Sequence, residues 1–276
     1  MPIVRVALLG DVVGQPGREA VRHAVPVLRA EHGADLVIVN AENARHGRGL
    51  HPVGMRELLD AGADALSLGD HYFDDVRIAD SLRDPGVPVA APCNVEDPPD
   101  AMRWTLLHTD AGVPIAHLSV IGRLFMPVEH SEPFGAIDRT IGALLEREPD
   151  ALVIVEMHCE ATSEKAACAY HCLWNWPGTV VVVTGTHTHV QTSDARLIES
   201  RLAAITDLGM CGAHEGVIGF DARASTDRII EQRPSRLELA TDGIEATGML
   251  VDLDTSLRRA VRARGVRVAC PSPAGA

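Results

Sequence analysis

The chain has 276 residues, of which 46% are hydrophobic and 23% charged, and its formal net charge is −13. This length and composition support a substantial core and exclude collagen, coiled-coil and disordered classes. No apolar run approaches the ~20 residues of a membrane span, and no leader-like segment opens the chain, so we expect a cytoplasmic protein. The negative charge argues against binding nucleic-acid phosphates, whereas an anionic small substrate remains compatible if bound cations supply positive charge.

Short apolar runs alternate with amphipathic stretches along the chain. The runs predict buried strands at residues 4–9, 36–39, 65–68, 87–90, 115–121, 152–155, 180–183 and 202–205. The amphipathic stretches predict helices at 17–31, 52–61, 74–83, 135–147, 163–173 and 224–232. Ser163 is the expected N-cap of the fifth helix.

Towards its end the sequence changes to strand-like segments. They cover 236–240, 244–253 and 257–268, with Asp242-Gly243 as a hairpin turn. This mixture favours an α/β fold with two packed sheets and helices outside. We expect a single domain over residues 1–268 and a disordered tail over 269–276.

Polar side chains follow six of the predicted strands, directly after each apolar run. In chain order they are Asp11; Asn40, Glu42 and Asn43; Asp70 and His71; Glu156 and His158; His187 and His189; and Asp207. Ligands bind at the carboxyl ends of strands in open α/β sheets, so we expect these side chains to converge. Any single Asp or Asn is alternatively a turn residue that bonds nearby backbone. Histidine has no comparable preference for turns, and the set contains four histidines.

The set offers oxygen and nitrogen donors and requires no cysteine. Such donors suit Mn, Fe or Zn better than a structural zinc held by thiolates. One catalytic metal takes three or four protein ligands, so the set suits two. Metals about 3.5–4 Å apart are typical of phosphate-ester hydrolysis, because together they lower the pKa of a bridging water and clamp the reacting oxygens. The six cysteines form no pair of CxxC motifs, and free thiols are the favoured interpretation.

Seven segments carry more specific motifs. They are GDVVGQPGRE (10–19), NAEN (40–43), GDHYFD (69–74), GRLFM (122–126), HCEATSEK (158–165), GTHTHVQ (185–191) and TDLGM (206–210). Through these motifs the chain resembles, from about residue 3 to 254, the YmdB-like metallophosphoesterases. These are described as 2′,3′-cyclic-nucleotide 2′-phosphodiesterases within the calcineurin-like superfamily. The resemblance implies a four-layer α/β/β/α sandwich with a dinuclear site, usually of iron or manganese.

The family's roles carry over to this sequence position by position. The resemblance implies that the ligands of a first metal are Asp11, Glu42, Asn43 and His189. Glu42 would bridge to a second metal, whose remaining ligands would be Asp70, His158 and His187. His71 resembles the family's catalytic histidine, placed to stabilise phosphoryl oxygens or protonate the leaving ribose oxygen, and Asp74 would orient it.

The sequence departs from the family pattern at Asp70, where the family normally has Asn. The ligand carboxylates of Asp11, Glu42 and Asp70 then total −3 against +4 for two divalent ions. We expect this to raise metal affinity and either shift metal preference or slow turnover. Tyr72-Phe73 and residues 45–48 also differ near the expected mouth of the site, so substrate preference is expected to differ.

Two weaker candidates remain open. Arg123 serves either the structure or the substrate, and Asp207 either holds a ligand histidine in its tautomer or completes a turn. The resulting prediction is a dinuclear metal-dependent phosphoesterase that hydrolyses small phosphodiesters, foremost 2′,3′-cyclic nucleotides, by attack of a metal-activated hydroxide on phosphorus. The alternative is a metal-containing, nucleotide-binding regulator weakened in catalysis. We expect no stable nucleic-acid or membrane binding, and the sequence leaves homo-oligomer formation open.

Overall fold

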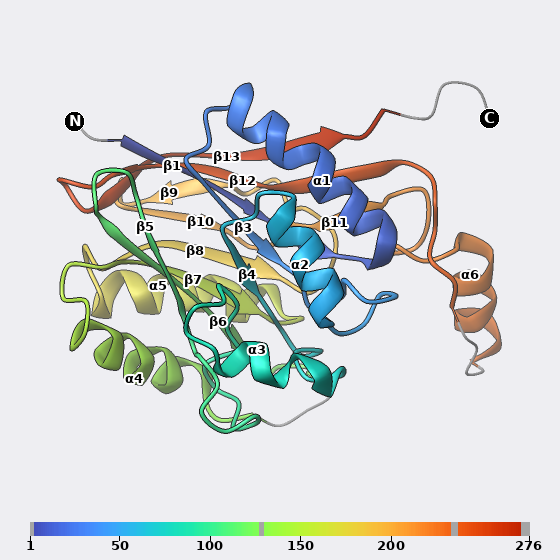
Figure 1. Ribbon diagram of the computed structural model, residues 1–276, viewed down its shortest axis with the longest axis horizontal. Helices are drawn as coiled ribbons and strands as arrows, with labels where there is room; N and C mark the ends of the chain where they lie inside the picture. The colour runs from blue at the N-terminus through green and yellow to red at the C-terminus, as the bar shows by residue number, and fades with distance from the viewer. Residues whose placement is uncertain (1–2, 127–129, 233–236, 272–276) are drawn as a thin grey trace.

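The structure is a computed structural model that describes residues 3–126, 130–232 and 237–271 (Figure 1). Within these residues the chain forms two sheets. The first has the order β2-β11-β12-β1-β3-β4, with β13 on the other side of β12, and the second has the order β5-β6-β7-β8-β10-β9. No helix among the described residues is long and apolar enough to cross a bilayer.

The bounds of the elements are as follows. The first sheet contains β1 (Ile3–Leu9), β2 (Asp11–Val12), β3 (Leu36–Asn40), β4 (Ala65–Ser67), β11 (Met210–Ala213), β12 (Ile244–Asp254) and β13 (Arg259–Ala269). The second contains β5 (Thr105–His108), β6 (Pro114–Ile121), β7 (Leu152–His158), β8 (Val180–Thr186), β9 (Arg196–Ile198) and β10 (Leu202–Ile205). The helices are α1 (Gly14–Ala30), α2 (Pro52–Asp60), the 3-10 turn η1 (Val76–Ile78), α3 (Ala79–Arg83), α4 (Pro133–Leu145), α5 (Thr162–Asn175) and α6 (Ala222–Glu231).

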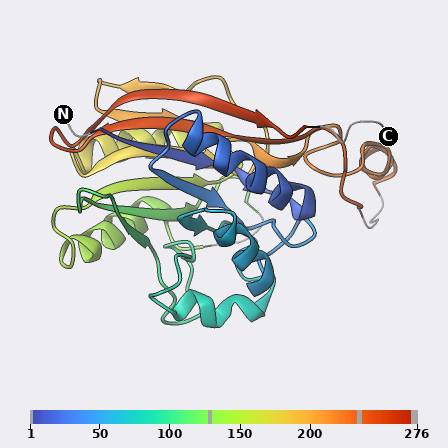
Figure 2. The same ribbon diagram turned by 45° about the horizontal axis from the view of Figure 1, so that its top comes forward.

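Three apolar layers follow from the alternation of side chains along the strands. In β1, Val4, Val6 and Leu8 face the second sheet, and Ala7 and Leu9 face the helices on the outside. Strand β7 divides its side chains in the same way. Helices α1 and α2 cover the first sheet and α4 and α5 cover the second, as Figures 1 and 2 show. The predicted four-layer α/β/β/α sandwich is therefore confirmed.

Parallel pairing sets the position of the site. In the first sheet β1, β3 and β4 run parallel, and in the second β6, β7, β8 and β10 run parallel. In each block the loops that leave the carboxyl ends of neighbouring strands therefore lie side by side.

The segments outside the two parallel blocks differ most from expectation. Instead of a strand at 87–90 there is one isolated bridge between Val89 and Leu66, because Pro88 removes an amide donor from the middle of this run. Residue 236 lies outside the described residues, and the rest of the strand expected at 236–240 reduces to one bridge at Leu239. Asp242-Gly243 does not close a hairpin between adjacent strands. It precedes β12, and its carbonyls accept the amides of residues 214 and 215.

Helix ends and short strands account for the other differences. The helix expected at 74–83 is divided into η1 and α3, and α5 begins before Ser163, with Ala161 at its N-cap. Strands β2, β5, β9 and β11 were not predicted. The tail starts later than expected, because Ala269 ends β13 and the Cys270 amide donates to the Ile244 carbonyl at 2.8 Å. Residues 272–276 of the expected tail lie outside the described residues.

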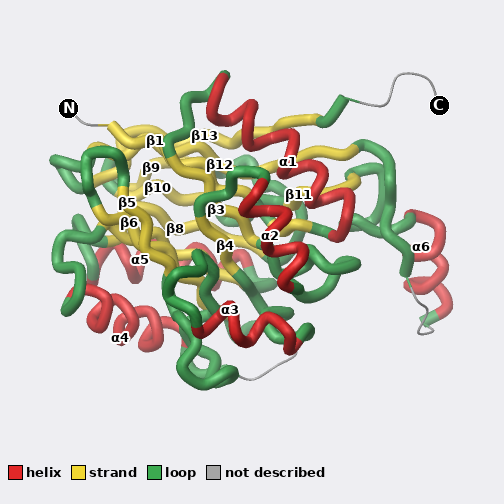
Figure 3. The backbone as a smooth tube through the Cα atoms, in the orientation of Figure 1, coloured by secondary structure: helices red, strands yellow, loops and turns green. Residues whose placement is uncertain are grey.

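One excursion leaves the sandwich. Between β11 and β12 the chain runs out to α6, which projects beyond the ends of the sheets (Figure 3). Only Ser225 of α6 is buried. This excursion forms one wall of the pocket described below.

Candidate metal centre

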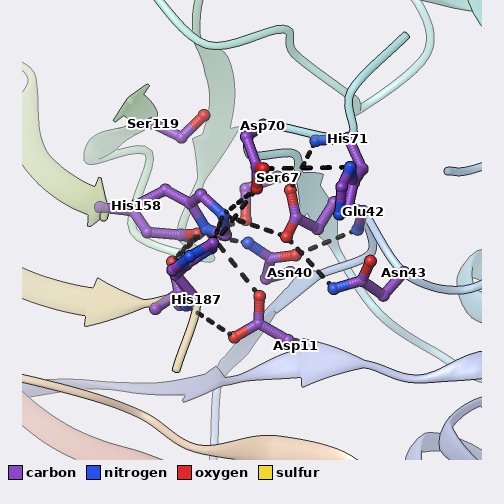
Figure 4. Close-up of polar contacts among 12 residues, drawn as sticks. Asp11, Asn40, Glu42, Asn43, Ser67, Asp70, His71, Ser119, His158 and His187 are labelled. Carbon is purple, nitrogen blue, oxygen red and sulfur yellow. Dashed lines mark hydrogen bonds and ion pairs between the residues drawn. The ribbon is translucent and has the colours of Figure 1, made fainter. Parts of the chain in front are cut away.

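Figure 4 shows that the predicted ligand residues other than His189 converge at strand ends from both sheets, and His189 lies beside Asn43. Asp11 follows β1 after a single glycine, and Glu42 and Asn43 follow β3. Asp70 lies beyond β4, where Gly69 is required, because a Cβ there would lie 2.3 Å from Glu42 Oε2 and 2.4 Å from the His158 ring. His158 ends β7, and His187 and His189 follow β8.

Four of these residues form a compact donor cluster. In Glu42, Asp70, His158 and His187, one ligand atom of each lies within 4.8 Å of those of the others. His158 Nε2 is 3.0 Å from Glu42 Oε1 and 2.9 Å from Asp70 Oδ1. His187 Nδ1 is 3.4 Å from the same Asp70 oxygen and 3.1 Å from His158 Nε2. Two carboxylates and two imidazoles at this spacing are a donor set for a transition-metal ion.

Asp11, Asn43 and His189 lie beside this cluster. The Asn43 amide nitrogen is 3.2 Å from Glu42 Oε1 and 3.2 Å from His189 Nε2. The Oδ1 atoms of Asp11 and Asn43 are buried and have no hydrogen-bond partner. His189 Nδ1 donates to the Ile218 carbonyl at 3.0 Å, which leaves Nε2 as its lone-pair atom. Buried oxygens without a partner are costly unless a cation binds them, so this second group also fits a metal.

The electrostatics of the centre also favour cations. Burial raises the pKa of Asp11 well above its ordinary value. Burial alone would lower the pKa of His158, but the surrounding carboxylates of Glu42, Asp70 and Asp11 raise it well above the usual range. Burial would likewise raise the pKa of Asp70, yet hydrogen bonds from His158 and His187 bring it below the usual value. The negative charge of these carboxylates is thus balanced by bound protons or by protonated imidazoles. Metal ions can take the place of these protons.

A buried carboxylate behind the cluster was not assigned a role from the sequence. Glu156 accepts hydrogen bonds from Asn40 Nδ2 and Ser67 Oγ, each at 2.6 Å, and from Thr186 Oγ1 at 2.9 Å. Because the Thr186 hydroxyl donates to Glu156, it accepts from His158 Nδ1, which lies 2.9 Å away. This bond leaves His158 Nε2 facing Glu42 and Asp70. The sequence placed Glu156 among the side chains that follow predicted strands, but gave no sign that it would hold His158 from inside β7.

The turn that carries His187 and His189 is held from behind by an ion pair. Both histidines have positive φ angles, 100° and 65°. Asp207 Oδ2 accepts from the Thr188 hydroxyl at 2.7 Å and from the Lys165 ammonium at 2.7 Å, and both charged side chains are almost fully buried. The structure thus places Asp207 behind the ligand turn, paired with Lys165, for which the sequence favoured a helix-capping or ion-pair role.

The remaining candidates lie at the edge of the centre. The His71 amide donates to Glu42 Oε2 at 3.1 Å, and His71 Nδ1 is 3.2 Å from Asp74 Oδ2, which also contacts Arg48 Nε. Arg123 is exposed, and its backbone amide donates to Glu164. It does not line the pocket over the cluster.

That pocket has a volume of about 780 Å³. Its polar lining includes Glu42, Asn43, His71, His187 and His189. Its apolar lining includes Ile218, Phe220 and Leu237 from the excursion between β11 and β12. No sequence pattern marked these apolar residues, because only the tertiary fold brings them to the pocket.

The layered sandwich and the donor cluster at its strand ends define the metallophosphoesterase type of fold. The family model described as YmdB-like protein matches residues 7–266, and the chain belongs to this family. A Bacillus subtilis (strain 168) protein named 2′,3′-cyclic-nucleotide 2′-phosphodiesterase is 35% identical over 260 residues, which cover 94% of this chain and 95% of the relative.

Two solved structures are also similar. A hypothetical protein from Thermus thermophilus superimposes with a TM-score of 0.86 at 34% identity, covering 97% of this chain and 100% of the other. A structure described as a novel phosphatase from Mycoplasma pneumoniae has a TM-score of 0.86 at 28% identity, covering 98% and 94%.

Proposed function

We propose that this protein is a metal-dependent phosphodiesterase that acts on small phosphate esters, with 2′,3′-cyclic nucleotides as its preferred substrates. The observation that carries the proposal is the donor cluster of Glu42, Asp70, His158 and His187 at one side of an open pocket, next to two buried oxygens without partners. The name of the Bacillus subtilis relative supports the substrate class. A cytoplasmic location, as expected from the sequence, is part of the proposal.

The proposed centre holds two metal ions, iron or manganese. Asp70, His158 and His187 would hold one ion, Asp11, Asn43 and His189 the other, and Glu42 both. When bound, such ions activate water and neutralise the charge of a phosphate. The donor set fits them, since it combines carboxylate and amide oxygens with imidazole nitrogens and contains no thiolate.

Residues of the chain itself would orient the substrate and move the proton. The His71 side chain is about one quarter exposed and lines the pocket. Its Nδ1 faces the Asp74 carboxylate, so its Nε2 is available to bond a phosphoryl oxygen or to protonate the leaving ribose oxygen. Cleavage of the 2′ ester bond would leave a 3′-phosphate.

Turnover by the purified protein tests the proposal. With added Mn²⁺ we expect hydrolysis of 2′,3′-cyclic AMP to 3′-AMP, and hydrolysis of bis-p-nitrophenyl phosphate. Elemental analysis should find two metal ions per chain. Glu42→Gln should lose both metal and activity, and Glu199→Gln, which changes an exposed glutamate that does not line the pocket, is the matched control. Intact esters in the presence of bound metal would refute the enzyme. Nucleotide binding without turnover would favour the regulatory alternative.

A further inference from the structure

The tight turn at residues 217–220 has an unusual residue at its tip. Val217 and Phe220 exchange backbone hydrogen bonds of 2.9 and 3.0 Å, and the two residues between them have positive φ angles, 46° for Ile218 and 94° for Gly219. Such two-residue turns favour Asn, Asp or Gly at both central positions. A β-branched residue is rare in this conformation, since its side chain crowds the backbone. Ile218 therefore holds a strained position that Asn would occupy without strain.

Packing in the core does not explain this isoleucine. Its side chain is 47% exposed and lines the same pocket as Glu42 and His187 of the donor cluster. Its carbonyl accepts the bond from His189 Nδ1, and a backbone carbonyl is available from any residue type. The tip is thus fixed to a ligand histidine through its backbone, and its side chain is free to contact whatever enters the pocket.

Phe220 gives the turn a second apolar surface in the same pocket. Its ring packs against Gly47, where a Cβ would lie 2.7 Å from Phe220 Cζ. The Phe220 ring therefore lies directly against the loop that follows Asn43. The turn thus contacts the loop with His189 and the loop that follows Asn43, and two of its apolar side chains line the pocket.

We infer that the turn at 217–220 is the binding surface for the base of a nucleotide substrate, with Ile218 and Phe220 packing on the base while the phosphate lies at the donor cluster. This inference rests on the proposed function and adds the residues that select nucleotides over other phosphodiesters. A nucleobase is flat and uncharged, so it suits the apolar residues of a pocket whose polar residues would bind an anion. Strain retained at an exposed tip is typical of a functional position.

Ile218→Asn tests the inference without removing the turn, because Asn suits the positive φ angle and keeps the carbonyl that His189 needs. We expect KM for 2′,3′-cyclic AMP to rise about five- to tenfold, the order expected when packing on one base is lost, with little change in kcat. KM for glycerol 1,2-cyclic phosphate, which has the same ring and no base, should stay the same. The melting temperature should stay the same or rise, because strain is relieved. Phe220→Leu should raise KM for the nucleotide in the same selective way.

Ile229→Asn, an exposed isoleucine on α6 that does not line the pocket, is the matched control and should change neither KM. Calorimetric binding of 3′-AMP and of inorganic phosphate repeats the comparison without turnover. Equal affinity of wild type and Ile218→Asn for 3′-AMP, or an equal KM rise for both substrates, would overturn the inference. A wild type that binds 3′-AMP but hydrolyses no ester would refute the proposed function and leave the base surface to be judged by binding alone.

Discussion

At the residue scale, the side chain of Asp70 affects both metal affinity and turnover. Its Oδ1 faces both His158 Nε2 and His187 Nδ1, so two imidazoles converge on one carboxylate oxygen. A carboxylate here binds cations more tightly than an amide would, but it also leaves less positive charge for the phosphate. The expectation that Asp70 raises metal affinity and either shifts metal preference or slows turnover therefore has a geometric basis.

We predict that Asp70→Asn weakens Mn²⁺ binding by about tenfold, equivalent to ~1.4 kcal/mol, because one negative charge is removed from the donor set. At saturating Mn²⁺ we expect kcat to increase. Metal titration followed by kinetics with bis-p-nitrophenyl phosphate measures both quantities. Asp74→Asn, which changes a carboxylate outside the donor cluster, is the control for metal affinity. An unchanged metal affinity together with an unchanged rate would contradict the prediction.

Lys165 is the only lysine in the sequence, and it is buried against Asp207. We predict that Lys165→Met destabilises the protein by about 3–5 kcal/mol, because the Asp207 charge remains buried without its partner. Metal affinity should also fall, since Asp207 fixes the turn with His187 and His189. Urea unfolding and metal titration measure these effects. The double variant Lys165→Met/Asp207→Asn should recover part of the stability, and failure to recover any would show that the pairing itself is not the cause.

Among the elements, α6 has the least support from the body of the protein. Its N-cap is Asp221, whose side chain accepts the Ala224 amide at 2.8 Å, and only Ser225 of the helix is buried. We predict that Asp221→Ala destabilises α6 locally by about 1 kcal/mol while the global melting temperature hardly changes. Hydrogen exchange should accelerate at residues 222–231 alone. A comparable fall in the global melting temperature would mean that α6 unfolds only with the whole protein.

The elements that could be predicted from sequence are those whose local pattern decides their structure. The run at 202–205 became β10 with the same bounds, because continuous apolar residues favour a strand buried on both faces. Strand β2 has two residues and begins with a buried aspartate, so no pattern can reveal it. The strand expected at 87–90 depended on β4, which it meets at one residue only. For β2 and for the segment at 87–90, pairing with strands distant in the sequence determined the structure, and the local pattern did not.

The same distinction applies to the site. Polar residues just after strands were predictable, since the carboxyl ends of parallel strands converge, and the structure brings Asp11, Glu42 and His189 together. Glu156 was expected near the site from its place after a predicted strand, but its hydrogen-bond role was not predictable, and Ile218 was not predictable as a site residue. Their importance comes from partners more than 25 residues away, Asn40 and His189, which only the fold brings close.

At the scale of the whole molecule, metal removal should reduce stability. Asp11, Glu42 and Asp70 are largely buried and near one another, so without cations their charges repel or must be neutralised by protons. We predict that EDTA lowers the melting temperature and that excess Mn²⁺ restores it. At a free concentration 100 times Kd, one ion adds about 2.7 kcal/mol. The shift should disappear in Glu42→Gln, and equal melting curves of the metal-loaded and chelated wild type would contradict the prediction.

The central position of β12 has a consequence for biosynthesis. Strand β1 is paired on one side with β12 along its whole length, from Ile3 opposite Asp254 to Leu9 opposite Gly248. A growing polypeptide on the ribosome therefore exposes one edge of β1 until almost all of both sheets has been translated. Asp11 follows this strand after Gly10, so the strand that leads to this expected ligand gains its neighbour on that side only when β12 has been translated.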